Sequence, residues 1–368
     1  MKAIIKIRAR FLLSMLAILV LGTTLVFISA EAKEDEYEAL QVGAAERMMK
    51  AEAYLKERIL EKGIEIELTD INQTALVGPE FTELTTTPGD EKAKRSALNP
   101  QFASLLIRYF KRAGLEEGDP IAIGATGSFP GFVIASLTAA TEMKLDTRLI
   151  VSCGSSMHGA TRVEYNVFDI VNDLKESGLA DFTLLAISPG GPGDRGGSVL
   201  EGILYEDTDL LALELCKEES EKTGAELIYK DKLADSIKRR RELYGDVKMF
   251  INVGGASVNS GESTYSLAFP HGLVLDPPKI PTSPTRGLNY EFAAEGIPVI
   301  NLLSVKLICQ DNGIPFDPVP LPSSFEGQAL PEVEYSKPLA GATLALVLWF
   351  FIWGLVDAIK RRDKNEEV

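Results

Sequence analysis

The chain has 368 residues, 45% of them hydrophobic, and a formal net charge of -15. This length is enough to bury a sizeable core, in one large domain or two smaller ones. The negative charge argues against a broad surface for nucleic acid or anionic lipid, and we expect no nucleic-acid partner.

The chain begins with an apolar segment, Phe11–Ile28, which has 18 residues without a charge. This is about the length of a helix that crosses a bilayer. Four basic side chains precede it, and basic flanks tend to stay in the cytoplasm. A basic start before an apolar stretch is also typical of a cleavable signal peptide. We therefore predict that residues 1–30 are a transmembrane anchor or a signal segment, and that export of the following residues holds in either case.

The middle of the chain alternates between short apolar strands and helices. Residues 31–43 are predicted to be an acidic tether, and residues 44–60 an amphipathic helix. Later helices are expected at 99–113, 130–143, 168–177, 200–223 and 231–244. Strands are expected at 120–123, 148–152, 182–187, 226–229, 247–253 and 298–302. This alternation predicts an α/β domain over residues 44–314, with a mostly parallel sheet and helices on both faces in a Rossmann-like three-layer arrangement.

The chain closes with a second apolar segment. Residues 315–338 are rich in proline and are predicted to be a stiff linker. Leu339–Val356 again has 18 residues without a charge, and a basic cluster follows it. We predict a transmembrane helix at 339–359 and a cytoplasmic tail at 360–368. With both ends inside, the α/β domain lies outside the cytoplasm.

Loops rich in glycine and serine follow four of the predicted strands. In an open parallel sheet the carboxyl ends of the strands form one edge, where ligands bind. Glycine lets the backbone approach a ligand, hydroxyl groups donate hydrogen bonds, and helix N-termini favour anions. The predicted ligand-binding residues are Gly124, Gly127, Ser128, Gly154, Ser155, Ser156, Gly190, Gly191, Asp194, Arg195, Gly254 and Gly255. The alternative is that these glycines only serve the geometry of the turns.

A serine hydrolase site is one possible use of these loops. Ser128 lies between a strand and a helix, as a hydrolase nucleophile does, but the two glycines of that motif are missing. A helix N-cap or an anion-binding role is the alternative. His158 follows a strand on the same edge, so it could serve as base for Ser128 or Ser155, with Asp194 orienting it. These four residues are the catalytic candidates, and a structural role is the alternative for each.

Other side chains could contact an anion, and none indicates a metal or a nucleotide. Arg195 could bind a carboxylate or phosphate, and Lys94 with Arg95 is a second candidate. The glycine-rich loop at 188–198 lacks the Lys-Ser/Thr of a P-loop. With three cysteines, two histidines and no CxxC, we predict no metal site and no cofactor.

Five short motifs, in their order, resemble the poly-gamma-glutamate system protein family: Thr85–Pro100, Gly124–Pro130, Cys153–Ser156, Gly190–Asp194 and Gly254–Ala256. The resemblance covers most of residues 75–320 and includes the layout with two anchors. Such proteins are associated with bacterial synthesis and export of poly-gamma-glutamate, alongside a separate ATP-dependent ligase and small membrane subunits. The resemblance implies no catalytic residues.

The resemblance implies a protein of the bacterial cytoplasmic membrane, anchored at both ends, with its main domain outside the cytoplasm. We expect a non-enzymatic accessory component of capsule or exopolymer synthesis that binds the anionic polymer or the synthase membrane subunits. Two alternatives remain open at this point. One is a serine-dependent amide hydrolase or transpeptidase that acts on the polymer, and the other is an exported protein that binds a small anion.

Overall fold

The structure is a computed structural model, and it describes residues 7–29, 31–32, 37–262, 265–276, 278–323, 330 and 333–366. The chain divides into two compact units. Residues 37–330 form the first, which is the α/β unit, and residues 1–36 together with 331–368 form the second. The α/β unit thus extends beyond the predicted range of 44–314 at both ends.

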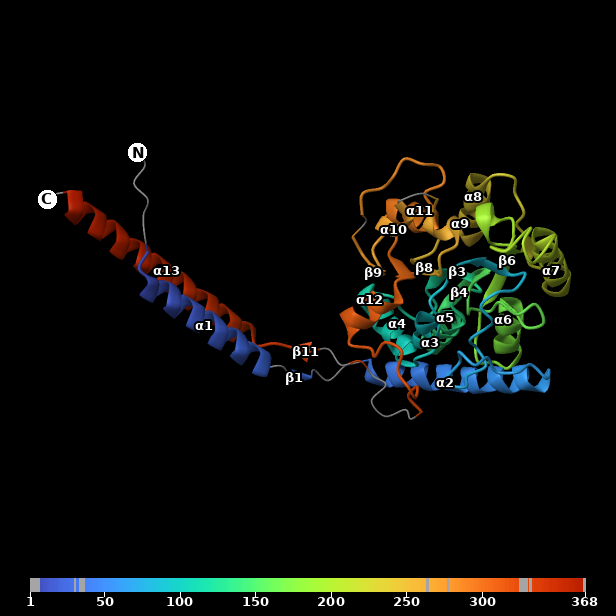
Figure 1. Ribbon diagram of the computed structural model, residues 1–368, viewed down its shortest axis with the longest axis horizontal. Helices are drawn as coiled ribbons and strands as arrows, with labels where there is room; N and C mark the ends of the chain where they lie inside the picture. Colours follow the sequence, from blue (N-terminus) through green and yellow to red (C-terminus); the bar gives the residue numbers. More distant parts are fainter. Residues whose placement is uncertain are drawn as a thin grey trace. The chain divides into compact units, whose positions relative to one another are not determined.

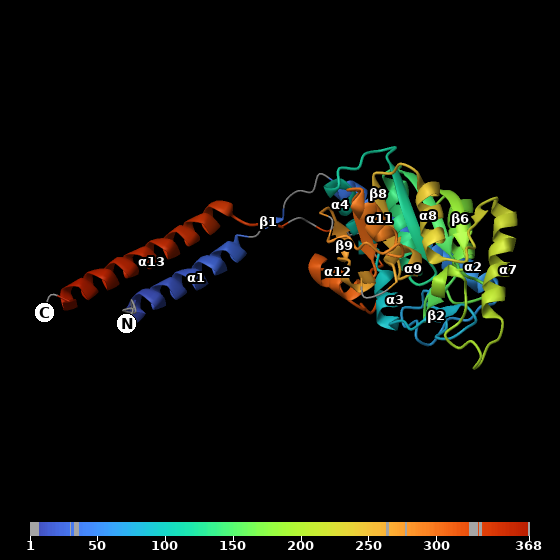
Figure 2. The same cartoon turned by 90° about the horizontal axis from the view of Figure 1, so that it is seen from above.

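The second unit contains two helices that are long and apolar enough to cross a membrane. They are α1 (Ala9–Ile28) and α13 (Lys337–Glu366), and they lie side by side in Figures 1 and 2. The Phe11 and Trp353 rings meet edge to face, with centroids 5.3 Å apart. Most of the remaining apolar side chains of these two helices are exposed. Short strands β1 (Glu31–Ala32) and β11 (Val333–Glu334) pair antiparallel.

The α/β unit is built on a seven-stranded sheet with the order β7-β6-β4-β3-β8-β10-β9. Its strands are β3 (Pro120–Thr126), β4 (Asp146–Ser152), β6 (Thr183–Ser188), β7 (Glu226–Leu227), β8 (Met249–Val253), β9 (Gly272–Val274) and β10 (Val299–Leu302). Every neighbouring pair is parallel except β9 with β10. The sheet is therefore mostly parallel, as predicted.

Both faces of the sheet are buried, because successive strand side chains point to opposite faces. Ile121 and Ile123 of β3 belong to one hydrophobic cluster, whereas Ala122 belongs to another. The first cluster includes side chains of α2 (Glu38–Glu61), α4 (Gln101–Arg112), α5 (Pro130–Glu142) and α6 (Val167–Glu176). The second includes side chains of α8 (Leu233–Tyr244), α9 (Ser257–Ser260) and α11 (Leu288–Ala294). Figure 1 shows these two sets of helices on opposite sides of the strands.

The remaining elements surround the carboxyl edge of the sheet or its ends. They are β2 (Thr85–Thr87), α3 (Glu91–Ala97), β5 (Ser155–Ser156), the 3-10 turn η1 (Pro192–Asp194), α7 (Thr208–Thr223), α10 (Tyr265–Ala268) and α12 (Val305–Asn312). β2 and β5 pair parallel and form a separate two-stranded sheet. This pairing brings the segment that leads into α3 to the loop that follows β4.

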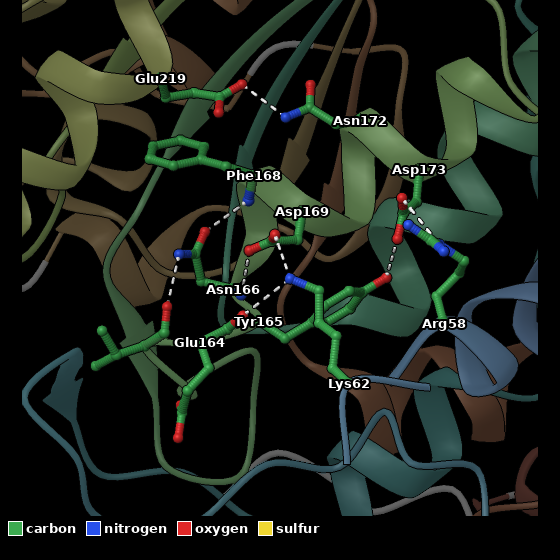
Figure 3. Close-up of polar contacts among 11 residues, drawn as sticks. Arg58, Lys62, Glu164, Tyr165, Asn166, Phe168, Asp169, Asn172, Asp173 and Glu219 are labelled. Carbon is green, nitrogen blue, oxygen red and sulfur yellow. Dashed lines mark hydrogen bonds and ion pairs between the residues drawn. The ribbon is translucent and has the colours of Figure 1, made fainter. Parts of the chain in front are cut away.

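Polar contacts tie α6 to the helices on either side of it (Figure 3). Asn166 caps α6 by accepting from the Phe168 N–H at 2.9 Å, while Asp169 accepts from the Asn166 N–H at 2.9 Å. The Tyr165 hydroxyl donates to Asp173 at 2.7 Å, and Arg58 of α2 contacts the same carboxylate at 3.5 Å. This reciprocal capping satisfies N–H groups that the first turn of a helix leaves free.

Two predicted boundaries differ from the structure, and local contacts explain both. The helix predicted over 200–223 begins only at Thr208, because the Glu201 carboxylate accepts from the Thr208 N–H and Asp207 has a φ of 56°. Conversely, α2 begins at Glu38, inside the predicted tether, because Gln41 and Ala44 are buried against the domain. Neither β9 nor α12 is among the elements predicted from the sequence.

Part of the predicted proline-rich linker belongs to the α/β unit. Asp317 accepts two hydrogen bonds from Arg95, both at 2.8 Å, and Phe316 packs against the core. Residues 324–329 and 331–332 of this linker lie outside the described residues.

The direction in which the chain adds strands to the sheet reverses at β3. This reversal determines where the site lies. From β3 the chain adds β4, β6 and β7 on one side, and then returns to add β8 and β10 on the other. The loops after β3 and β8 therefore diverge to opposite faces. In open parallel sheets a crevice forms at such a switch point, outside the carboxyl ends of the strands.

Candidate functional site

A cleft of about 710 Å³ opens at this switch point. Four loops that follow parallel strands line it, and they span residues 126–129, 154–156, 190–193 and 255–257. Within these ranges Gly127 and Ser155 do not line the cleft. Two further segments complete its walls, the one that leads through β2 into α3 and the one that follows β10. The cleft is thus lined by the glycine-rich and serine-rich loops that the sequence places at this edge.

Lys94 of α3 is the buried cation of the cleft. Its side chain is only 2% exposed. The Nζ atom donates to the Ser128 carbonyl oxygen and to Ser156 Oγ, the latter at 2.5 Å. It also lies 3.6 Å from the centroid of the Phe129 ring, a cation–π distance. Lys94 forms no ion pair with any residue that the structure describes.

Burial lowers the pKa of Lys94 from 10.5 to about 7, against a smaller opposing effect of the Asp90 charge. Desolvation disfavours the ammonium form, and no carboxylate compensates for it at close range. Near neutral pH a substantial fraction of Lys94 is therefore an uncharged amine. Such an amine can accept a proton, which an exposed lysine cannot do at that pH.

Backbone and hydroxyl contacts hold the two serines of the site together. The Ser156 N–H donates to Ser128 Oγ at 3.0 Å, and the Ser128 N–H donates to Thr126 Oγ1 at 3.2 Å. Thr126 Oγ1 also approaches the Val253 carbonyl oxygen, at 3.4 Å. Three loops, which follow β3, β4 and β8, are thereby fixed relative to one another around Lys94.

Two glycines allow these loops to approach closely. A Cβ at Gly254, which has a φ of 97°, would lie 2.4 Å from Thr126 Oγ1. A Cβ at Gly154 would lie 2.7 Å from Thr86 Cγ2 and 3.0 Å from the Gly191 nitrogen. Any larger residue would push the walls of the cleft apart, so these glycines are needed for its shape.

Asp194, a predicted catalytic residue, has a structural environment. Its carboxylate accepts from Arg240 Nη2 at 3.0 Å, from Ser188 at 2.6 Å and from Ser236 at 2.5 Å. Arg240 is fully buried, and Asp194 is 3% exposed. The pair links the turn after β6 to α8, and Asp194 is unavailable to orient a histidine.

His158, the predicted base, is not joined to either candidate serine. Its backbone N–H donates to the Pro79 carbonyl oxygen at 3.2 Å, and its φ is 62°. Nδ1 is buried and has no hydrogen-bond partner among the described residues. The Ser155 hydroxyl is fully buried and donates to the Ser156 carbonyl oxygen at 2.9 Å. The described residues therefore contain no Ser-His-Asp arrangement at this edge.

The predicted arginines also lie away from the cleft lining. Arg195 pairs with Asp231 at 2.9 Å and stacks on the Tyr229 ring at 4.4 Å. Arg95 is held by Asp317 and does not line the cleft. Both guanidinium groups are engaged by other side chains.

The predicted ligand-binding residues divide into two groups. Those that line the cleft are Ser128, Gly154, Ser156, Gly190, Gly191 and Gly255. Those outside its lining are Gly124, Gly127, Ser155, Asp194, Arg195 and Gly254. From the sequence, Lys94 is only a second candidate contact for a carboxylate, and no sequence pattern connects it to Ser156. No signal in the sequence separates Lys94 from Lys92, which is exposed on the same short helix.

The described residues offer no cluster for a metal ion, since no group of three or more His, Cys, Asp or Glu side chains converges there. Cys153, Cys216 and Cys309 are buried and unbridged. No protein-family model matches the chain, and no curated protein is significantly similar to it.

Proposed function

We propose that this protein is a membrane-anchored accessory component of a bacterial poly-gamma-glutamate synthesis or export system. In this proposal its α/β domain, of the Rossmann-like three-layer type, lies outside the cytoplasm and binds the polymer in the cleft. The observation that carries it is the buried Lys94 amine on the wall of a cleft lined by hydroxyl groups and glycines. The synthase membrane subunits are the proposed partners of the two apolar helices.

The chemistry of the cleft suits such a polymer. Poly-gamma-glutamate presents one carboxylate and one backbone amide per unit. An ammonium group binds a carboxylate, and hydroxyl groups bind both carboxylates and amides. Among the described lining residues, Lys306 and the protonated fraction of Lys94 offset most of the charge of Asp90 and Glu262. The cleft therefore lacks the large negative charge of the whole chain, which would otherwise repel a polyanion.

The test is calorimetric titration of the full chain in detergent with gamma-linked oligoglutamate at low salt. Removing a buried charge-assisted contact costs about 1.5–3 kcal/mol, or roughly a tenfold to a hundredfold loss of affinity. Lys94→Met should show this loss. Lys92→Met is the matched control, because Lys92 is exposed two residues earlier on the same helix and does not line the cleft.

The outcome contradicts the proposal if the wild-type chain does not bind the oligomer, or if Lys94→Met binds it as tightly as Lys92→Met does. Equal binding of free glutamate or inorganic phosphate would instead favour the small-anion alternative. Alpha-linked oligoglutamate gives the same charge with a different spacing, and it measures how far the cleft recognises the gamma linkage.

A further inference from the structure

The contact between Lys94 and Ser156 has the form of a base and a nucleophile. Ser156 Oγ lies 2.5 Å from Lys94 Nζ, and both residues line the cleft. Serine–lysine pairs perform acyl transfer on several unrelated folds. We propose that Ser156 and Lys94 form a catalytic dyad that cleaves amide bonds of a gamma-glutamyl chain through an acyl-serine intermediate. This inference rests on the proposed function, because the substrate is the polymer that occupies the same cleft.

The surroundings of Lys94 favour the role of a base. Its amine is removed from water and has no ion-pair partner among the described residues, so its uncharged form is populated near neutral pH. In that form one N–H of Lys94 still donates to the Ser128 carbonyl oxygen, and the nitrogen lone pair can accept the Ser156 hydroxyl proton. The Ser128 contact thus orients the amine toward Ser156.

Ser156 is better placed as a nucleophile than either serine singled out in the sequence. Ser155 Oγ is fully buried and is used in a backbone contact. Ser128 Oγ accepts from the Ser156 N–H, while it is the Ser128 carbonyl group that contacts the lysine. In the part of the chain that the structure describes, Lys94 is the only hydrogen-bond partner of Ser156 Oγ.

The reaction balances without any oxidant or cofactor. Ser156 Oγ attacks the amide carbonyl carbon while its proton passes to Lys94 Nζ, and the carbonyl oxygen takes the electron pair. Collapse of this intermediate breaks the C–N bond, and Lys94 returns the proton to the leaving nitrogen as an amine. Water then attacks the ester and gives its proton to Lys94. The ester C–O bond then breaks, Lys94 returns this proton to Ser156 Oγ, and a carboxylic acid leaves, so the net change is amide plus water to acid plus amine.

The experiment uses the full chain in detergent and two readouts. A fluorophosphonate probe reports the nucleophile by mass spectrometry of the labelled peptide, and release of primary amine from gamma-linked oligoglutamate reports cleavage. We expect the label on Ser156, and at least a hundredfold loss of labelling and of amine release in Ser156→Ala. The control is Ser177→Ala, an exposed serine after α6 that does not line the cleft. Lys94→Arg keeps a cation but supplies no base, so it should lose both signals.

The outcomes separate the two proposals. If folded wild-type chain binds the oligomer but carries no label, or if the label lies on another serine, the dyad is wrong and the binding function stands. If Ser156 is labelled but the oligomer neither binds nor is cleaved, the dyad stands and the polymer is the wrong substrate. A melting temperature of Ser156→Ala equal to that of wild type in scanning calorimetry shows that a lost signal is a loss of chemistry rather than of folding.

Discussion

The buried amine of Lys94 also makes the stability of the α/β unit depend on pH. In the unfolded chain this lysine titrates near 10.5, whereas in the folded unit its pKa is lowered to about 7. Between these values the unfolded chain binds more protons than the folded one. The free energy of unfolding therefore rises with pH over this range, and the cost of burying the charge is fully present below pH 7.

We expect Lys94→Met to raise the melting temperature of the α/β unit below pH 7, because it removes a buried charge that costs a few kcal/mol. This advantage should shrink as the pH rises from 7 to 10, where the wild-type lysine becomes neutral. Scanning calorimetry is the suitable measurement, since both tryptophans, Trp349 and Trp353, lie in α13 and do not report on the α/β unit.

Lys92→Met again serves as the control, and it should show no such trend with pH. A stability difference between Lys94→Met and wild type that stays constant from pH 6 to 10 would contradict the shifted titration of Lys94. It would leave the hydrogen bonds of Lys94 as the only contribution of this side chain.

Asp194 shows how burial can separate a residue from the role its sequence context suggests. The sequence places it in a glycine-rich loop at the ligand edge, beside candidate catalytic residues. In the structure it neutralises the fully buried Arg240, which lies 46 positions later. A buried charge needs such a partner, and removing either member would leave the other unpaired. The pair therefore serves the structure of the unit rather than chemistry in the cleft.

At the scale of elements, Asn166 caps the N-terminus of α6 (Figure 3). We expect Asn166→Ala to lower the free energy of unfolding by about 1 kcal/mol, because it removes the acceptor for the Phe168 N–H. Asn166→Ser retains an acceptor at the N-cap and should cost less. Calorimetry of both variants measures the difference, and equal costs would mean that the cap contributes nothing beyond packing.

The strands and most helices of the α/β unit could be predicted from sequence because each is defined by local features. Strands β3, β4 and β8 each contain a short apolar run and are followed by a glycine within two residues, a pattern that can be recognised without knowing the neighbouring strands. The late start of α7 depends on Glu201, whose side chain reaches Thr208. Such a contact overrides the helical pattern of residues 200–207, and the spacing of apolar residues does not reveal it.

The position of the cleft in the fold could be predicted from the sequence, but its chemistry could not. Glycine and serine after successive strands locate the edge, since the carboxyl ends of parallel strands must meet there. The pairing of β2 with β5 is what brings Lys94 to Ser156, across 62 positions of sequence. Neither strand has a clear signal of its own, and the sequence therefore favours His158, which lies on the predicted ligand edge, as the candidate base.

At the scale of the whole molecule, charge and hydrophobicity are segregated along the chain. The two apolar helices carry basic residues at their outer ends, whereas most of the acidic residues lie between them. This arrangement underlies the proposal that both ends are cytoplasmic and that the α/β unit is exported. The three native cysteines are buried, so they give a low background for labelling experiments.

Single cysteines at two exposed positions test this topology. Ser177→Cys lies in the α/β unit and Lys360→Cys lies near the end of α13. In intact bacterial cells, a membrane-impermeant maleimide should label Ser177→Cys at once, whereas Lys360→Cys should react only after the membrane is permeabilised. The wild-type chain measures the background. The reverse pattern would place the cleft in the cytoplasm, where an exported polymer could not reach it, and would overturn the proposed location together with the proposed ligand.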